Sequence, residues 1–200
     1  MKTKAKKKVG AKCKMSVVSD EDIIRIFDYL YINNLIVILG IVKFLLNTGK
    51  SIKEVLEIKF EDLKTDKTLN KSCLITARIL KEYYKSKNYI KYDTGYLFKS
   101  YIKLGEEAIS YKGVYKYFKK IQKDLEIKYP FNTNSLRKKW GKEVYRETGN
   151  ILIVMKMLGQ VNPMYTLEYI EEDNFQEVNL KENEKISIET LEKIYQKINY

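Results

Sequence analysis

An almost uninterrupted run of apolar residues, Leu35 to Leu46, constrains the fold of this chain more than any other feature of its sequence. The run contains a single charged residue, Lys43. It is too short to cross a bilayer as a helix, which takes about 20 apolar residues. A helix that is apolar on nearly every side must be covered by other elements, so we expect residues 34–47 to form the central helix of a packed core.

Segments on both sides of this run carry signals for helix starts. Ser19, with Asp22 three residues later, predicts the first of them. Ser51 precedes Glu54 with the spacing of a capping box, which predicts another. The apolar face expected for the helix that follows Ser19 comprises Ile23, Ile24, Phe27, Leu30 and Tyr31.

Farther along the chain, similar signals alternate with polar breaks. Residues 64–75 are polar and turn-like and suggest a small hairpin, whereas Tyr96-Leu97-Phe98 is expected to be a buried anchor. The expected fold class is therefore mainly α with a small β element (α+β). Further helices are expected from Thr76 to about Lys85, from Ser110 to about Leu125, from about Asn134 to Gly149, over 151–158 and over 165–170.

The charge of the chain makes a polyanion the first partner to consider. Its 38 lysines and arginines exceed its 26 acids and give a formal net charge of +12. Seven of these lysines lie within residues 1–14. A block of like charges repels itself, so we expect this N-terminal arm to be disordered alone. It would serve either as an arm that contacts phosphates or as a solubilising tail, and composition alone does not separate the two. The lysines of this arm are Lys2, Lys4, Lys6, Lys7, Lys8, Lys12 and Lys14.

Histidine and cysteine usage excludes several classes of site. The chain has no histidine, which excludes a Ser-His-Asp triad and any zinc site that needs a histidine ligand. Cys13 and Cys73 show no CxxC spacing, so we expect free thiols in a reducing compartment, with no bound metal and no cofactor. The N-terminus lacks the apolar core of a signal peptide, and we expect a cytoplasmic, DNA-associated protein without a membrane partner.

The most distinctive region is 134–170, where three short motifs follow one another at fixed spacing. Asn134-Ser135-Leu136-Arg137 opens a predicted helix, Leu158-Gly159-Gln160 follows, and Tyr169 comes nine residues after Gln160. Upstream lie Thr48-Gly49-Lys50-Ser51-Ile52 and the Tyr96-Leu97-Phe98 anchor. In order and spacing, this set resembles the catalytic domain of tyrosine recombinases, the phage integrase family, over residues 16–172.

The resemblance implies a fold and a chemistry. In this family a tyrosine attacks a DNA phosphate and forms a phosphotyrosyl intermediate, while two arginines clamp the phosphate oxygens. A lysine on a hairpin protonates the leaving 5′ oxygen, and Lys64 and Lys67 are both candidates for it. The implied catalytic positions are Tyr169, Arg137, Gln160, Asn134, Lys64, Lys67 and Ser51. The implied DNA contacts are the arm lysines together with Lys50, Lys138 and Lys139.

Against the family pattern, the site is depleted. Ser51 occupies the place of the first arginine, and Lys50 or Lys53 would be only a partial substitute. Asn134 and Gln160 occupy histidine positions and can donate hydrogen bonds but cannot transfer protons.

Plain alternatives exist for each position. Ser51 would be a helix N-cap, Arg137 a surface or phosphate-positioning residue, and Asn134 a helix cap. Tyr169 is one of 17 tyrosines, and Trp140 is expected in the core rather than as a base-stacking platform.

The sequence thus supports three hypotheses. The first is a catalytic-domain-only integrase-like protein that binds double-stranded DNA with weak or lost strand transfer. The second is an active site-specific recombinase, and the third is a non-catalytic DNA-binding regulator or architectural protein on the same scaffold. We expect an acidic linker and a C-terminal amphipathic helix over 173–200, which would pack on its own domain or join a homo-oligomer. Its apolar stripe comprises Ile188, Leu191, Ile194 and Ile198.

Overall fold

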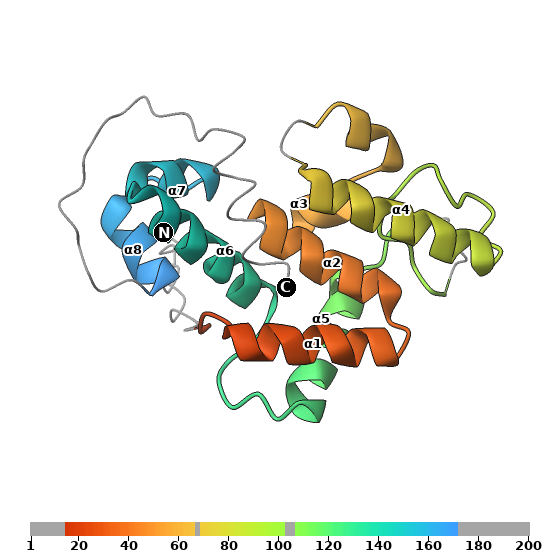
Figure 1. Ribbon diagram of the computed structural model, residues 1–200, viewed down its shortest axis with the longest axis horizontal. Coiled ribbons are helices and arrows are strands. Elements are labelled where there is room, and N and C mark those ends of the chain that lie inside the picture. Colours follow the sequence, from red (N-terminus) through yellow and green to blue (C-terminus); the bar gives the residue numbers. More distant parts are fainter. Residues whose placement is uncertain (1–14, 67–68, 103–106, 172–200) are drawn as a thin grey trace, which may run out of the picture.

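The computed structural model describes residues 15–66, 69–102 and 107–171. Within these ranges the chain forms eight α-helices and one 3-10 helix, η1 (Figure 1). Helices α6, α7 and α8 lie together on one side of the molecule, and α4 lies on the other (Figure 1). The elements are α1 (Asp20–Ile32), α2 (Ile36–Thr48), α3 (Ile52–Glu57), η1 (Phe60–Lys64), α4 (Lys71–Ser86), α5 (Tyr111–Asp124), α6 (Thr133–Thr148), α7 (Ile151–Met157) and α8 (Pro163–Ile170).

Helix α2 is the central element, as its apolar sequence predicts. It packs against α1, α3, α4 and α6, and most of its side chains are buried. The N-cap residue of α2, Leu35, has an apolar side chain, which accepts no hydrogen bond from the first backbone N–H groups of the helix. The hydroxyl of Tyr101 accepts a hydrogen bond from the backbone N–H of Val37 instead, at 3.2 Å. The prediction of a core helix over 34–47 is confirmed.

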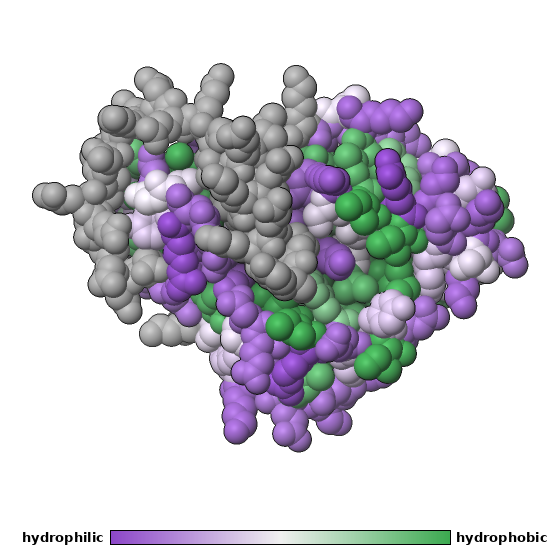
Figure 2. Space-filling view, in the orientation of Figure 1, coloured by the Kyte–Doolittle hydropathy of each residue, from purple (hydrophilic) through white to green (hydrophobic). Residues whose placement is uncertain are grey.

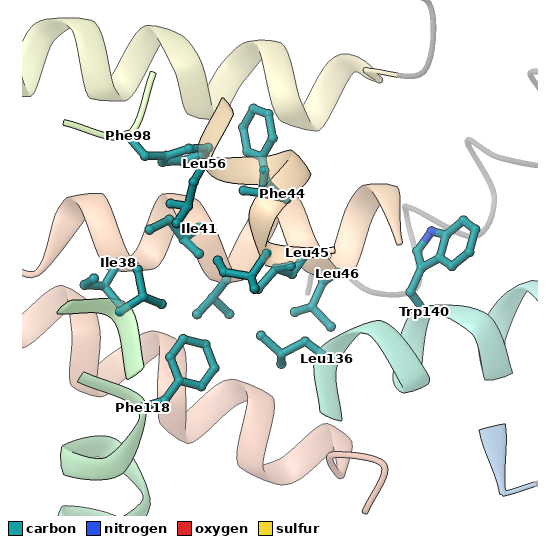
Figure 3. Close-up of a cluster of buried hydrophobic side chains, with 14 of the residues drawn as sticks. Ile38, Ile41, Phe44, Leu45, Leu46, Leu56, Phe98, Phe118, Leu136 and Trp140 are labelled. Atoms are coloured by element: carbon teal, nitrogen blue, oxygen red, sulfur yellow. The ribbon is translucent and has the colours of Figure 1, made fainter. Parts of the chain in front are cut away.

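The core around α2 collects side chains from elements far apart in sequence (Figure 3). The rings of Phe44 and Phe98 meet edge to face with centroids 5.0 Å apart. Leu97 and Phe98 are fully buried and Tyr96 is partly buried, so the predicted anchor is confirmed for Leu97 and Phe98. Because burying each large apolar side chain contributes about 1.5–3 kcal/mol, this cluster fixes the position of α2 and of the turn that follows it. Some apolar side chains also reach the surface over α2 and α4 (Figure 2).

The buried face of α1 differs from the predicted one. Ile24 and Tyr31 are 52% and 71% exposed, whereas Ile26 is fully buried. The acidic residue Asp22 is also buried, because Arg25 donates to its Oδ1 at 2.7 Å and the Tyr129 hydroxyl donates to its Oδ2 at 2.6 Å. Apolar periodicity alone could not anticipate a satisfied carboxylate on the inward face.

The small β element is not found in the described part of the chain. Of the segment expected to form a hairpin, Lys64 ends η1 and residues 71–75 already belong to α4. Antiparallel pairing is limited to two isolated bridges, Lys59 with Tyr96 and Lys99 with Ala108. Helix α4 begins before Thr76 because the Asn70 side chain accepts a hydrogen bond from the backbone N–H of Cys73 at 2.9 Å and caps the helix there.

The later helices follow the predicted boundaries closely. Ser110 caps α5, and Gly149 ends α6 in the left-handed conformation. Pro163 is the first residue of α8, a position where its missing N–H costs no hydrogen bond. Among the described residues, no helix combines the length and apolar character required to cross a membrane. The predicted C-terminal helix and the basic arm lie outside the described residues.

Candidate active site

Arg137 lies in the first turns of α6 and bridges two turns of the chain. Its Nε donates a hydrogen bond to the carbonyl of Gly49 at 2.6 Å, and one terminal nitrogen donates to the carbonyl of Leu158 at 3.0 Å. Gly49 follows α2, and Leu158 follows α7. A single guanidinium therefore joins three of the motifs that the sequence places far apart.

Close packing explains why glycine follows α2. Gly49 has a φ of +62°, a conformation that side chains rarely adopt, and a Cβ there would lie 2.2 Å from Cε3 of Trp140. Trp140 is fully buried one turn after Arg137 on α6 (Figure 3). The expectation that this tryptophan belongs to the core is confirmed. The indole supports the turn whose carbonyl orients Arg137.

The free donors of Arg137 are suited to an anion. A guanidinium has five N–H donors, and two hydrogen bonds to carbonyls leave three without a partner among the described residues. Glu54 is also within electrostatic reach. The pKa of its carboxyl is lowered mainly by hydrogen bonding to Ser51, with smaller contributions from the charges of Arg137 and Lys50. The neighbourhood therefore combines fixed positive charge with unused donors.

Tyr169 lies near the end of α8 with most of its side chain covered. Burial raises the pKa of its hydroxyl, and the positive charge of Arg137 opposes that rise. The positive charge of Arg137 therefore acts on the Tyr169 hydroxyl, and the convergence of the two residues on one phosphate stays a prediction. The ammonium of Lys138 lies 5.2 Å from the centroid of the Tyr169 ring. At neutral pH the hydroxyl is protonated and has to lose its proton to act as a nucleophile.

Gln160 carries a buried polar atom whose hydrogen bonding is incomplete. It follows Gly159, and its backbone N–H donates to the carbonyl of Met155 at 2.9 Å. Its side-chain Oε1 is buried and has no hydrogen-bond partner in the described part of the chain. An unsatisfied buried acceptor costs about 1–3 kcal/mol, so this amide is suited to a partner that the domain does not supply.

Asn134 does not cap α6. Asn132 is the N-cap, and its Oδ1 accepts from the backbone N–H of Asn134 at 2.7 Å. The side chain of Asn134 is exposed, so the capping interpretation is wrong for this residue. An exposed amide at the start of the helix that carries Arg137 keeps its donor for solvent or for a ligand.

Ser51 is the N-cap of α3, as the capping-box spacing predicts. Its hydroxyl accepts from the backbone N–H of Glu54 at 3.4 Å, and its own N–H donates to the Glu54 carboxylate at 2.7 Å. Lys50 is partly buried and forms an ion pair with Asp66 at 3.4 Å. Lys53 is exposed. The place of the first family arginine thus holds a structural hydroxyl, and the adjacent lysine is already paired.

The structure describes one of the two candidate hairpin lysines. Lys64 is exposed at the end of η1, and Lys67 lies outside the described residues. Asn70, the N-cap of α4, donates to the side chain of Asn47 at 3.2 Å, which places the start of α4 beside the end of α2.

Lys138 and Lys139, which we predicted to contact DNA, are instead buried. The ammonium of Lys138 lies 3.1 Å from a carboxylate oxygen of Glu171. The ammonium of Lys139 lies 2.7 Å from Asp20 and 2.9 Å from Glu143. Because carboxylates of the same domain neutralise both lysines, neither presents a free exposed charge. The arm lysines lie outside the described residues.

Glu171 is a residue at this site that sequence reasoning missed. The sequence analysis gave it no role in the site. In the structure it ends α8 with a φ of +56° and contacts both α6 and the start of the domain. No sequence signal marks these contacts, since its partners are 33 and 154 residues away.

Comparisons with known proteins identify a family and a fold. The sequence profile of the phage integrase family matches residues 17–175. The crystal structure of XerA recombinase is similar to this chain with a TM-score of 0.61, over 96% of this chain and 67% of that one. The two sequences are 16% identical, so this likeness concerns the fold. Among curated proteins, none matches the sequence significantly.

Proposed function

The chain belongs to the phage integrase family, and we propose that it is a DNA-binding integrase-like protein of the tyrosine recombinase class whose strand cleavage is slow. One observation carries the proposal. Arg137 binds the turns after α2 and α7, keeps three N–H donors that have no partner in the described part of the chain, and lies within electrostatic reach of Tyr169. This combination of a fixed cation and a phenol suits a phosphodiester.

The proposed reaction is attack on a DNA phosphate. The Tyr169 oxygen bonds to phosphorus and loses its proton to water or hydroxide, and the bond from phosphorus to the 5′ oxygen breaks. The leaving oxygen takes up a proton, with Lys64 and Lys67 as candidate donors. Negative charge builds on the nonbridging oxygens, which the free donors of Arg137 would stabilise. The phosphotyrosyl ester lets the strand be rejoined without outside energy.

Two features support a slow reaction. Ser51 is committed to capping α3 and carries no charge, so one of the two family clamps is missing. Removing one donor of this kind typically costs a factor of about 100–1000 in rate. The chain also has no histidine, and the amides of Gln160 and Asn134 cannot transfer protons. Lys50 would replace the missing charge only after leaving Asp66.

The proposed partner is duplex DNA. The net charge of +12 and the lysine-rich arm favour a polyanion, and each phosphate neutralised contributes about 0.9 to the salt slope of binding. Replacing the seven arm lysines with glutamine should therefore flatten the dependence of affinity on salt; an unchanged slope would refute a phosphate role for the arm. A cytoplasmic location and a homo-oligomer formed through the C-terminal helix remain predictions.

A suicide-nicked duplex containing the DNA that flanks the gene tests the chemistry. We expect a covalent protein–DNA adduct that survives denaturation and is lost in Tyr169→Phe. Tyr165→Phe is the matched control, since Tyr165 is 63% exposed on the same helix. Tight binding without an adduct would instead support the non-catalytic regulator. Absence of binding at low salt would contradict every DNA-based function.

A further inference from the structure

Glu171 connects three parts of the molecule at the end of the helix that carries Tyr169. Its carboxylate accepts from the Lys138 ammonium at 3.1 Å and from the backbone N–H of Val17 at 3.3 Å. Its carbonyl accepts from the Lys142 ammonium at 2.7 Å. These bonds tie the end of α8 to α6 and to the segment that leads back to the basic arm.

Lys138 contacts both Glu171 and Tyr169. Its side chain is only 10% exposed, and its ammonium pairs with Glu171 while lying 5.2 Å from the centroid of the Tyr169 ring. A cation over an aromatic face is attractive, and the attraction grows as water is removed. The lysine therefore touches the tyrosine and the residue that ends its helix at the same time.

Close packing between α6 and α8 completes the arrangement. A Cβ at Gly141 would lie 2.9 Å from Cγ2 of Ile170, so the absence of a side chain lets α8 approach α6 closely. Gly141 is one turn after Lys138 on the same face of α6. The glycine permits the contact, and the charged pair fixes where along α6 the tyrosine lies.

We propose that Glu171 and Lys138 are positioning residues for Tyr169: their ion pair holds α8 against α6 so that the phenol keeps its place over the Lys138 side chain. The proposal rests on the proposed function for its catalytic consequence, but the docking of α8 is measurable without any reaction. It assigns Lys138 a role in place of the expected DNA contact. It also connects the segment that follows the basic arm to the end of α8, because the backbone N–H of Val17 donates to the Glu171 carboxylate.

Amide hydrogen exchange of the peptide covering residues 160–171 measures how often α8 opens, with or without activity. Lys138→Met and Glu171→Gln remove the charge pair at nearly constant side-chain length. Because Glu171 is 43% exposed, we expect a moderate effect, about a fivefold faster exchange in both variants. Lys138→Arg keeps the charge and should exchange like the parent. Lys156→Met, an exposed lysine of α7, is the matched control and should change nothing.

Adduct formation from a preformed DNA complex then separates positioning from binding. We expect Lys138→Met and Glu171→Gln to lower the rate constant about fivefold while the Kd for DNA and its salt slope stay within twofold. A fall in affinity with a salt slope smaller by about 0.9 would instead make Lys138 a phosphate contact and overturn the proposal.

Unchanged exchange in α8 would overturn the proposal as well. So would faster exchange with an unchanged cleavage rate. If the parent protein forms no adduct, the cleavage part of the proposed function fails, and exchange alone then decides whether the pair holds α8.

Discussion

The carbonyl oxygen of Gly49 accepts a hydrogen bond from Nε of Arg137 at 2.6 Å, across 88 residues of sequence. The same guanidinium also binds the carbonyl of Leu158. The residue that we propose to contact a phosphate therefore also joins the turns after α2 and α7. Substitutions at Arg137 should affect stability and DNA chemistry together, and experiments have to separate the two.

Arg137→Lys keeps one positive charge but cannot bridge two carbonyls, because an ammonium lacks the planar fork of donors. We expect a loss of about 2 kcal/mol in the free energy of unfolding, since charge-assisted hydrogen bonds contribute about 1.5–3 kcal/mol each and lysine recovers part of that. DNA cleavage should fall at least tenfold under conditions where the variant is folded. Urea unfolding followed by fluorescence of Trp140, the only tryptophan, measures the first effect. Parent-like stability would contradict the bracing role.

Gly49→Ala should be much more destabilising than Gly149→Ala. Both glycines have a φ near +62°, but a Cβ at Gly49 would collide with the Trp140 ring and one at Gly149 would meet nothing within 4 Å. We expect about 1 kcal/mol of backbone strain in either variant and at least about 2 kcal/mol more at Gly49. The comparison of the two unfolding midpoints isolates the contact with the indole. Equal losses would show that the ring yields without cost.

Ser51→Arg restores the charge that the family pattern places there. It removes the cap of α3, which costs about 1 kcal/mol, and it should raise the rate of adduct formation at least tenfold. Ser51→Ala is the matched control, because it loses the cap without adding charge and should give no gain in rate. If the arginine variant is folded and no faster than the parent, the missing clamp is not what limits cleavage.

The rate of adduct formation should rise with pH between 7 and 9. Burial raises the pKa of the Tyr169 hydroxyl, so the phenolate is scarce at pH 7 and its fraction grows up to tenfold per pH unit. The chain has no histidine that could take the proton near neutral pH. Single-turnover rates at constant ionic strength test this, with circular dichroism to confirm that the fold is intact. A flat or bell-shaped profile centred near pH 7 would point to another base.

Alkaline conditions should unfold the protein through its buried tyrosines. Burial raises the pKa of Tyr84 and of Tyr101 above the ordinary value of about 10. A raised folded-state pKa contributes stability that is fully present below pH 10 and is lost as pH rises from there toward the folded value. Thermal melts should therefore show a nearly constant contribution from these groups up to about pH 9 and a falling Tm above pH 10. Tyr101→Phe should weaken the fall; a parent-like slope in that variant would exclude Tyr101 as a source.

Local signals in the sequence were sufficient for most of the secondary structure. The apolar run that became α2 and the Ser51–Glu54 capping box were predicted correctly because each depends on residues within one or two turns. The prediction of a hairpin was wrong because it, too, used only local signals. The polar residues before Thr76 are typical of a turn, but the Asn70 side chain caps α4, so the helix begins before Thr76.

The candidate site was likewise only partly predictable from the sequence. Order and spacing alone identified Arg137 and Tyr169 as positions that should come together, because the family pattern is written in the sequence. Only the tertiary structure decided which partner each charged group binds. Arg137 donates two hydrogen bonds to backbone carbonyls, and Lys138 is buried in an ion pair with Glu171. A lysine codon specifies a charge and a reach, but whether that charge faces solvent, a carboxylate or an aromatic ring depends on the packing of helices distant in sequence.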